Sequence, residues 1–167
     1  MSQLSQLSQH AIAHAHEVLD SEAIHALLGH RHPFLLVDRI DVLEPGRQVV
    51  GTKQISSGEW WCEGHDAGSI QFPFSLVIEA MAQTTGALIR DLVGGAGGGI
   101  AYFMGVNHVR LRTFARPGDE LTMLLTLWQW RRGICRTHGV ATVAGGLVAS
   151  ADLTTVIRTV KDTPPAT

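Results

Sequence analysis

The stretch FSLVIEAMAQTTGALIRDLV, residues 74–93, decides the fold of this chain. As a helix it would carry apolar residues nearly all round the cylinder, which predicts one long helix at the centre of the protein. Pro73 stands just before it, where a missing N–H does no harm. The segment GGAGGG, 94–99, is predicted to end it as a loop. A phosphate-binding role for that loop is weak, because no Lys-Ser or Lys-Thr pair follows.

The segments around this helix read as strands. Breaks at Pro117-Gly118, Gly133 and Gly145-Gly146 have the lengths expected of hairpins, so the sheet is predicted to be antiparallel. Before the helix, Ser21 is expected to cap a short helix, EAIHALLG, that Gly29 ends. The strand-like runs are VVGTKQIS (49–56), IAYFMGVNHVRLRTF (100–114), DELTMLLTLWQWRR (119–132), ICRTHGVATVA (134–144) and LVASADLTTVIRTV (147–160). Together these elements predict an α+β fold.

Composition narrows the class of protein. The chain has 167 residues, of which 45% are hydrophobic and only 17% charged. So low a share of charged residues suggests that part of the surface is buried in a subunit interface. A net charge of −2 argues against nucleic-acid binding. Two widely spaced cysteines, no apolar leader and no membrane-length apolar run favour a cytoplasmic protein without a membrane segment. We expect a flexible leader at 1–19, a single domain at 20–160 and a flexible tail at 161–167.

Within the central segment, Glu79 is the residue that needs an explanation. Almost all its neighbours are apolar, and a buried carboxylate is costly unless it is paired or protonated. The apolar surroundings therefore predict a carboxyl that keeps its proton and can act as an acid. His65, in the preceding loop, has the side chain best suited to act as a base near neutral pH.

Three blocks in register carry a family resemblance: HRHPFLLVDR, then EGH followed by VIEAMAQ, then YFMGVNHVRLRTFARPGDEL. Together they resemble the FabZ-type 3-hydroxyacyl-[acyl-carrier-protein] dehydratases of fatty-acid biosynthesis, over about residues 20 to 160. The resemblance implies a hot-dog fold, in which a bent antiparallel sheet wraps a long central helix. It also implies a homodimer or a trimer of dimers acting on acyl carrier protein, with no cofactor and no metal.

The same resemblance implies roles for single residues. His65 and Glu79, 14 residues apart, match the catalytic pair, with glutamate rather than aspartate favouring the FabZ branch. Tyr102 matches a tyrosine at the mouth of the acyl tunnel. Backbone N–H groups at Phe74 and Ser75 are predicted to meet the thioester oxygen at the helix N-terminus. With Gln83, these residues make up the predicted substrate-binding set: Phe74, Ser75, Gln83 and Tyr102.

The sequence departs from the family pattern in the loop HDAGSIQFPF, 65–74. Asp66, Ala67 and Ile70 replace Phe, Pro and Pro, and Phe74 replaces a glycine at the start of the helix. Because this loop shapes the thioester end of the pocket, the departure bears on substrate choice.

Several alternatives stay open at this stage. Glu79 can be a structural carboxylate bonded to Gln83, its i+4 neighbour. A hot-dog acyl thioesterase and a non-catalytic acyl-binding subunit are the two competing functions. Three arginines in the third block are either a solvated strand face or a surface that attracts the acidic carrier protein: Arg110, Arg112 and Arg116.

Overall fold

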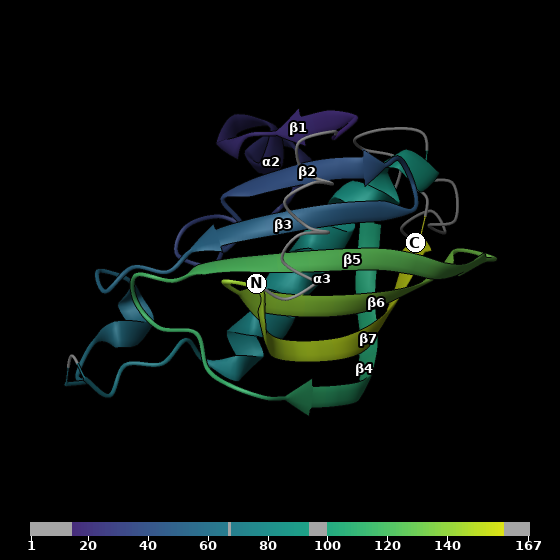
Figure 1. The fold of residues 1–167 in the computed structure, drawn as a ribbon. Helices are drawn as coiled ribbons and strands as arrows, with labels where there is room; N and C mark the ends of the chain where they lie inside the picture. The colour runs from purple at the N-terminus through teal and green to yellow at the C-terminus, as the bar shows by residue number, and fades with distance from the viewer. Residues whose placement is uncertain (1–14, 67, 94–99, 159–167) are drawn as a thin grey trace, which may run out of the picture.

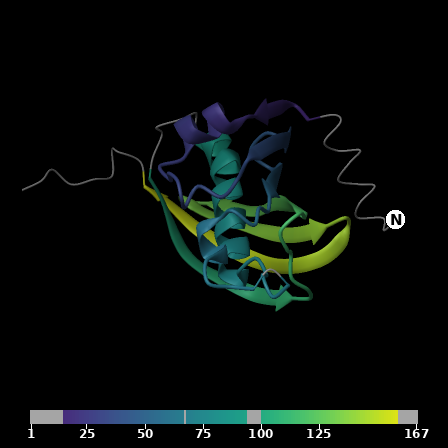
Figure 2. The same ribbon diagram turned by 90° about the vertical axis from the view of Figure 1, so that its left-hand side faces the viewer.

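The long helix predicted at the centre is present as α3, Phe74–Leu92, one residue shorter than expected. The computed structural model describes residues 15–66, 68–93 and 100–158. The predicted leader up to residue 14, the glycine-rich loop at 94–99 and the tail at 161–167 lie outside the described residues, as does Ala67. Figures 1 and 2 show α3 against the concave face of a strongly curved sheet, which confirms the α+β, hot-dog prediction.

The sheet has seven strands, all paired antiparallel, in the order β1-β2-β3-β5-β6-β7-β4. The side chains of β5 alternate between buried and partly exposed as far as residue 126, so its buried face packs on α3. The strands are β1 Glu17–Leu19, β2 Arg39–Glu44, β3 Gln48–Gln54, β4 Ile100–Leu111, β5 Glu120–Arg131, β6 Ile134–Val143 and β7 Gly146–Arg158.

Two glycines let α3 lie close to the sheet. A Cβ built on Gly51 of β3 would come 2.2 Å from Oγ1 of Thr84 on the helix. A Cβ on Gly139 of β6 would lie 3.0 Å from the Met81 sulfur. Gly51 has no room for a methyl group, so the distance between α3 and β3 depends on its being glycine. At Gly139 an added methyl would displace the ends of the Met81 and Leu125 side chains, Leu125 being the nearer at 2.9 Å.

The two hairpins that join β5 to β6 and β6 to β7 confirm the predicted glycine breaks. Arg132 and Gly133 have φ of 51° and 73°, and Ala144 and Gly145 have φ of 46° and 76°. Two consecutive residues with positive φ are typical of type I′ turns, whose twist matches that of the flanking strands.

The predicted hairpin at Pro117-Gly118 is wrong. Strand β4 pairs with β7 at the edge of the sheet, and β5 pairs with β3 instead. The connection leaves the sheet, because the N–H of Phe72 donates to the carbonyl of the fully buried Ala115 at 2.8 Å. The segment after β4 therefore packs on the residues that precede α3, and the chain then returns to the sheet as β5.

The N-terminal part of the fold corrects three expectations. Helix α2, Ser21–Leu27, is capped by Asp20, whose carboxylate accepts from the Ala23 N–H at 2.9 Å, and not by Ser21. It ends at the extended Leu28, before Gly29. Residues 17–19, expected to belong to the leader, form β1 and pair with β2. The sequence did not predict β2 either, because these short strands lack a clear alternation of apolar residues.

Within the described residues, no helix is both long and apolar enough to cross a membrane.

We predict that Gly51→Ala destabilises the protein by overpacking, at about 1–3 kcal/mol. The double variant Gly51→Ala/Thr84→Ala is expected to recover part of this loss, because it removes the two closest atoms, Oγ1 and Cγ2 of Thr84, at 2.2 and 2.8 Å. Urea unfolding measures both. Gly29→Ala is the control, since no atom lies within 4 Å of its added Cβ. A Gly51→Ala variant as stable as the parent would contradict the close approach of helix and sheet.

Candidate active site

Glu79 lies in the first half of α3, on a face that the sheet does not cover. Its side chain is 29% exposed in this chain, which differs from the expectation of a buried carboxyl. Two apolar residues near it on the helix, Ile78 and Ala82, are also only partly buried. The cause is the shape of the fold, because a sheet that wraps one face of a helix leaves the opposite face to other contacts.

The Gln83 side chain hydrogen-bonds that of Glu79, as expected for a structural carboxylate bonded to its i+4 neighbour. Its Nε2 donates to Glu79 Oε1 at 2.9 Å and to the carbonyl of Phe34 at 2.8 Å. Its Oε1 accepts from the N–H of Leu36 at 2.9 Å. The amide is only 2% exposed, so every bond it makes is inside the protein. Gln83 thus ties Glu79 to the backbone of the segment that leads into β2.

His30 is the site residue that the sequence reasoning missed. Its Nε2 lies 3.4 Å from Glu79 Oε1, the oxygen that also accepts from Gln83. It belongs to the block HRHPFLLVDR, which served only to recognise the family. The separation of 49 residues from Glu79 gives no local pattern by which it could have been found.

His65 lies in an exposed loop that a left-handed glycine introduces, Gly64 having a φ of 76°. The Nδ1 of His65 is 3.1 Å from the carbonyl oxygen of Glu63. A carbonyl only accepts, so Nδ1 carries the hydrogen and the neutral ring keeps its lone pair on Nε2. The ring is therefore held in the tautomer that leaves Nε2 able to take up a proton.

A buried ion pair fixes the segment that leads to this loop. The Nζ of the buried Lys53 lies 3.1 Å from Oε2 of Glu59. The same carboxylate accepts from the Trp61 ring N–H at 3.1 Å, within the short 3₁₀ helix η1, Trp60–Cys62. His65 therefore follows a rigidly held turn.

His65 and Glu79 are not bonded to each other. Across the described residues, no hydrogen bond or ion pair joins the two side chains, and each has other partners. Tyr102 is also apart from Glu79: it is exposed on the edge strand β4, beside Met104, Val156 and Arg158. Within the predicted set, a side-chain hydrogen bond joins Glu79 and Gln83.

Phe74 and Ser75 begin α3 after Pro73, which provides no side-chain cap. The N–H groups of Leu76 and Val77 both donate to the Pro73 carbonyl, at 2.9 and 3.2 Å. No backbone acceptor in the described part of the chain takes the N–H groups of Phe74 and Ser75. They are therefore available to an acceptor from outside the chain. The Phe74 side chain is partly buried and packs on the core.

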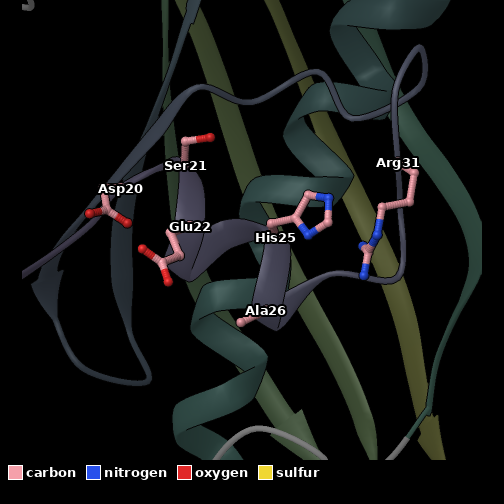
Figure 3. A pocket seen from close by; sticks show the side chains of 6 residues that line it. All are labelled: Asp20, Ser21, Glu22, His25, Ala26 and Arg31. Atoms are coloured by element: carbon pink, nitrogen blue, oxygen red, sulfur yellow. The ribbon is translucent and has the colours of Figure 1, made fainter.

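Other polar clusters lie away from these residues. His138 and His108 hydrogen-bond the two oxygens of Asp152, at 2.6 and 2.8 Å, and hold the pKa of that carboxyl below its usual range. The open hollow in Figure 3 contains none of the predicted site residues; it is lined by Asp20, Ser21, Glu22, His25, Ala26 and Arg31. Among the described residues, no group of three or more His, Cys, Asp or Glu is placed to hold a metal ion.

Neither cysteine resembles a nucleophile. Burial raises the pKa of the Cys135 thiol to about 12 and also raises that of Cys62. Both are free and buried, so the chemistry of the site rests on imidazole and carboxyl groups.

A long helix held in the concave face of a curved antiparallel sheet defines the hot-dog class. Similar folds include the dehydratase heterocomplex ApeI:P of Xenorhabdus doucetiae, with a TM-score of 0.68 and 17% identity over 83% of this chain and 93% of that one. Another is Cj0977 of Campylobacter jejuni, with a TM-score of 0.62 and 12% identity over 83% and 89%.

The chain belongs to the FabA-like family, whose model matches residues 28–152. It is 45% identical over 140 residues to the 3-hydroxyacyl-[acyl-carrier-protein] dehydratase FabZ of Syntrophotalea carbinolica, covering 84% of this chain and 93% of the relative. To the FabZ dehydratase of Cronobacter sakazakii it is 42% identical over 136 residues, covering 81% and 90%. These findings confirm the FabZ-type resemblance.

We predict that Gln83→Leu destabilises the protein by roughly 1–3 kcal/mol, because it leaves the buried N–H of Leu36 without its acceptor. The midpoint of urea unfolding measures the change. Thr85→Val is a matched control on the same helix, since the buried Thr85 hydroxyl donates only to its own helix, at Met81. Equal stabilities of the two variants would show that the Gln83 bonds contribute nothing particular.

Proposed function

We propose that this protein dehydrates 3-hydroxyacyl thioesters carried on acyl carrier protein to trans-2-enoyl thioesters, in fatty-acid or related acyl-chain biosynthesis. The observation that carries the proposal is the 45% identity with a FabZ dehydratase over 84% of the chain. The side chains suit that reaction, because it needs one base, one acid and donors for an oxyanion.

His65 is proposed as the base. Its Nε2 lone pair, left free by the bond of Nδ1 to Glu63, takes the proton from C2 of the substrate. The electron pair of that C–H bond forms the C2–C3 double bond, and the C3–O bond breaks. Glu79 gives its proton to the departing hydroxyl, which leaves as water. The catalytic roles of His65 and Glu79 follow from their agreement with the family pattern and from their chemistry.

The start of α3 is proposed to receive the thioester carbonyl. Negative charge collects on its oxygen as C2 loses its proton. The N–H groups of Phe74 and Ser75 need an acceptor and point from a helix N-terminus, which favours that charge. We further propose that the Phe74 ring narrows the thioester end of the pocket, where the family pattern has glycine, and that Tyr102 and Gln83 contribute to the substrate site.

Two copies of the chain are proposed to build each active site. The family pattern takes the histidine from one chain and the acid from its partner, and the absence of a direct His65–Glu79 bond among the described residues agrees with that arrangement. The edge strand β4 supports a homodimer, because its outer edge has no neighbour among the described strands. It carries exposed apolar side chains that pairing with a second copy would cover: Tyr102, Phe103, Met104, Val106, Val109 and Leu111. A trimer of such dimers remains a prediction from the family resemblance.

The carrier protein is the proposed partner. Exposed arginines at the end of β4 and beyond it offer a basic surface to an acidic protein: Arg110, Arg112 and Arg116. The cytoplasmic location stays a prediction from the sequence.

Incubation with a 3-hydroxyacyl thioester tests the activity. Enoyl absorbance is the expected product signal, and free thiol would indicate the thioesterase alternative. Neither signal would indicate a non-catalytic subunit. Glu79→Gln and His65→Ala are expected to fold normally and to lose turnover by about 10²–10⁴-fold, as is typical of a lost general acid or base. Near-native turnover in either variant would refute the assignment of that residue.

Mixing the two inactive variants tests the shared site. In a mixed dimer of His65→Ala and Glu79→Gln chains, one site collects both defects and the other collects neither. With random exchange about half the dimers are mixed, so about a quarter of the wild-type activity should return. Exchange without recovery, verified with differently tagged subunits, would show that both residues of a site come from one chain.

A further inference from the structure

His30 contacts the proposed acid, and the dehydration mechanism above gives it no role. Its Nε2 is 3.4 Å from Glu79 Oε1. The imidazole is 42% exposed and the carboxyl 29% exposed, so the pair lies at the boundary between the protein and its surroundings. The question is whether this proximity is incidental or built into the fold.

The segment that carries His30 is held from two sides. Gln83 of α3 binds the backbone of Phe34 and Leu36, at 2.8 and 2.9 Å. On the other side the Trp60 ring N–H, from η1, donates to the Pro33 carbonyl at 3.1 Å. The segment therefore connects the helix that bears Glu79 with the turn that leads to His65.

Arg31 holds the backbone of His30 itself. The Nη1 of Arg31 donates to the carbonyls of His30 and Leu28, each at 2.7 Å. The guanidinium, which is the charged group next to His30 in sequence, is thus directed at backbone oxygens. These bonds restrain the His30 backbone, from which the imidazole reaches Glu79.

The hydrogen bonds decide which oxygen of Glu79 can carry the acid proton. Both hydrogens of the Gln83 amide are donated, one to Phe34 and one to Glu79 Oε1. Oε1 is therefore an acceptor, and a neutral carboxyl in this arrangement has its proton on Oε2. His30 Nε2, 3.4 Å from Oε1 and outside hydrogen-bond geometry, would place a second N–H close to that oxygen. With the Gln83 bond, this N–H would favour the orientation of the carboxyl that leaves its proton on Oε2.

We propose that His30 is a positioning residue that, together with Gln83, holds Oε1 of Glu79 so that the Oε2 proton faces the hydroxyl to be expelled. This proposal rests on the proposed dehydratase function. When Oε2 passes its proton to the C3 hydroxyl and water leaves, the negative charge spreads over both carboxylate oxygens. The His30 N–H then stabilises the charge on Oε1, so it favours the transition state over the bound substrate.

Substitutions at His30 test the role through turnover. His30→Ala removes the donor and is expected to lower kcat roughly tenfold or more with little change in KM, in line with a hydrogen bond to a charged group. His30→Gln places an amide N–H near the position of Nε2 and should restore most of kcat. His25→Ala, at an exposed α2 position that lines the hollow in Figure 3, is the control and should leave kcat unchanged.

A second measurement does not depend on activity. In ¹⁵N spectra of the imidazole groups, Glu79→Gln should move the Nε2 signal of His30 and leave that of His25 in place. An unmoved His30 signal overturns the contact. If the wild type is active, two results would overturn the role of His30 while leaving the proposed function intact. One is a kcat of His30→Ala within twofold of the wild type. The other is a folded His30→Gln variant that is as slow as His30→Ala. An inactive wild type overturns the proposed function, and the positioning role falls with it.

Discussion

The close contact between α3 and the sheet is the constraint on which the rest of the structure depends. Gly51 lets β3 approach Thr84 so closely that no side chain fits between them, which holds this face of the helix against the sheet. Glu79 is thereby turned away from the strands and toward the segment before β2. The position of the proposed acid is therefore set by contacts on the opposite face of its own helix.

The elements that could be predicted from sequence were those whose cause is local. The many apolar residues of α3 predict a largely buried helix, and the residue pairs Arg132-Gly133 and Ala144-Gly145 make tight turns by their own conformation. The pairing of β4 with β7 could not be predicted in this way. This pairing depends on the hydrogen-bond partners of the segment after β4, which lie far away in the chain.

The same division applies to the candidate site. The Glu79–Gln83 bond follows from helical spacing and was among the expected alternatives. The partial exposure of Glu79 and its contact with His30 depend on the folded path of a distant loop, which no spacing rule describes. His65 was selected from the family pattern. Its tautomer, in contrast, is decided by the Glu63 carbonyl and becomes visible only with coordinates.

The bonds between Gln83 and the loop before β2 are made to main-chain atoms only, namely the Phe34 carbonyl and the Leu36 N–H. Every amino acid except proline supplies both groups, so the alignment of the acid places no demand on the Phe34 side chain, which is 42% exposed. A change of the Phe34 side chain would therefore alter what this surface presents to the outside while leaving both bonds in place. The outer face of the loop and the alignment of the carboxyl beneath it are physically separable.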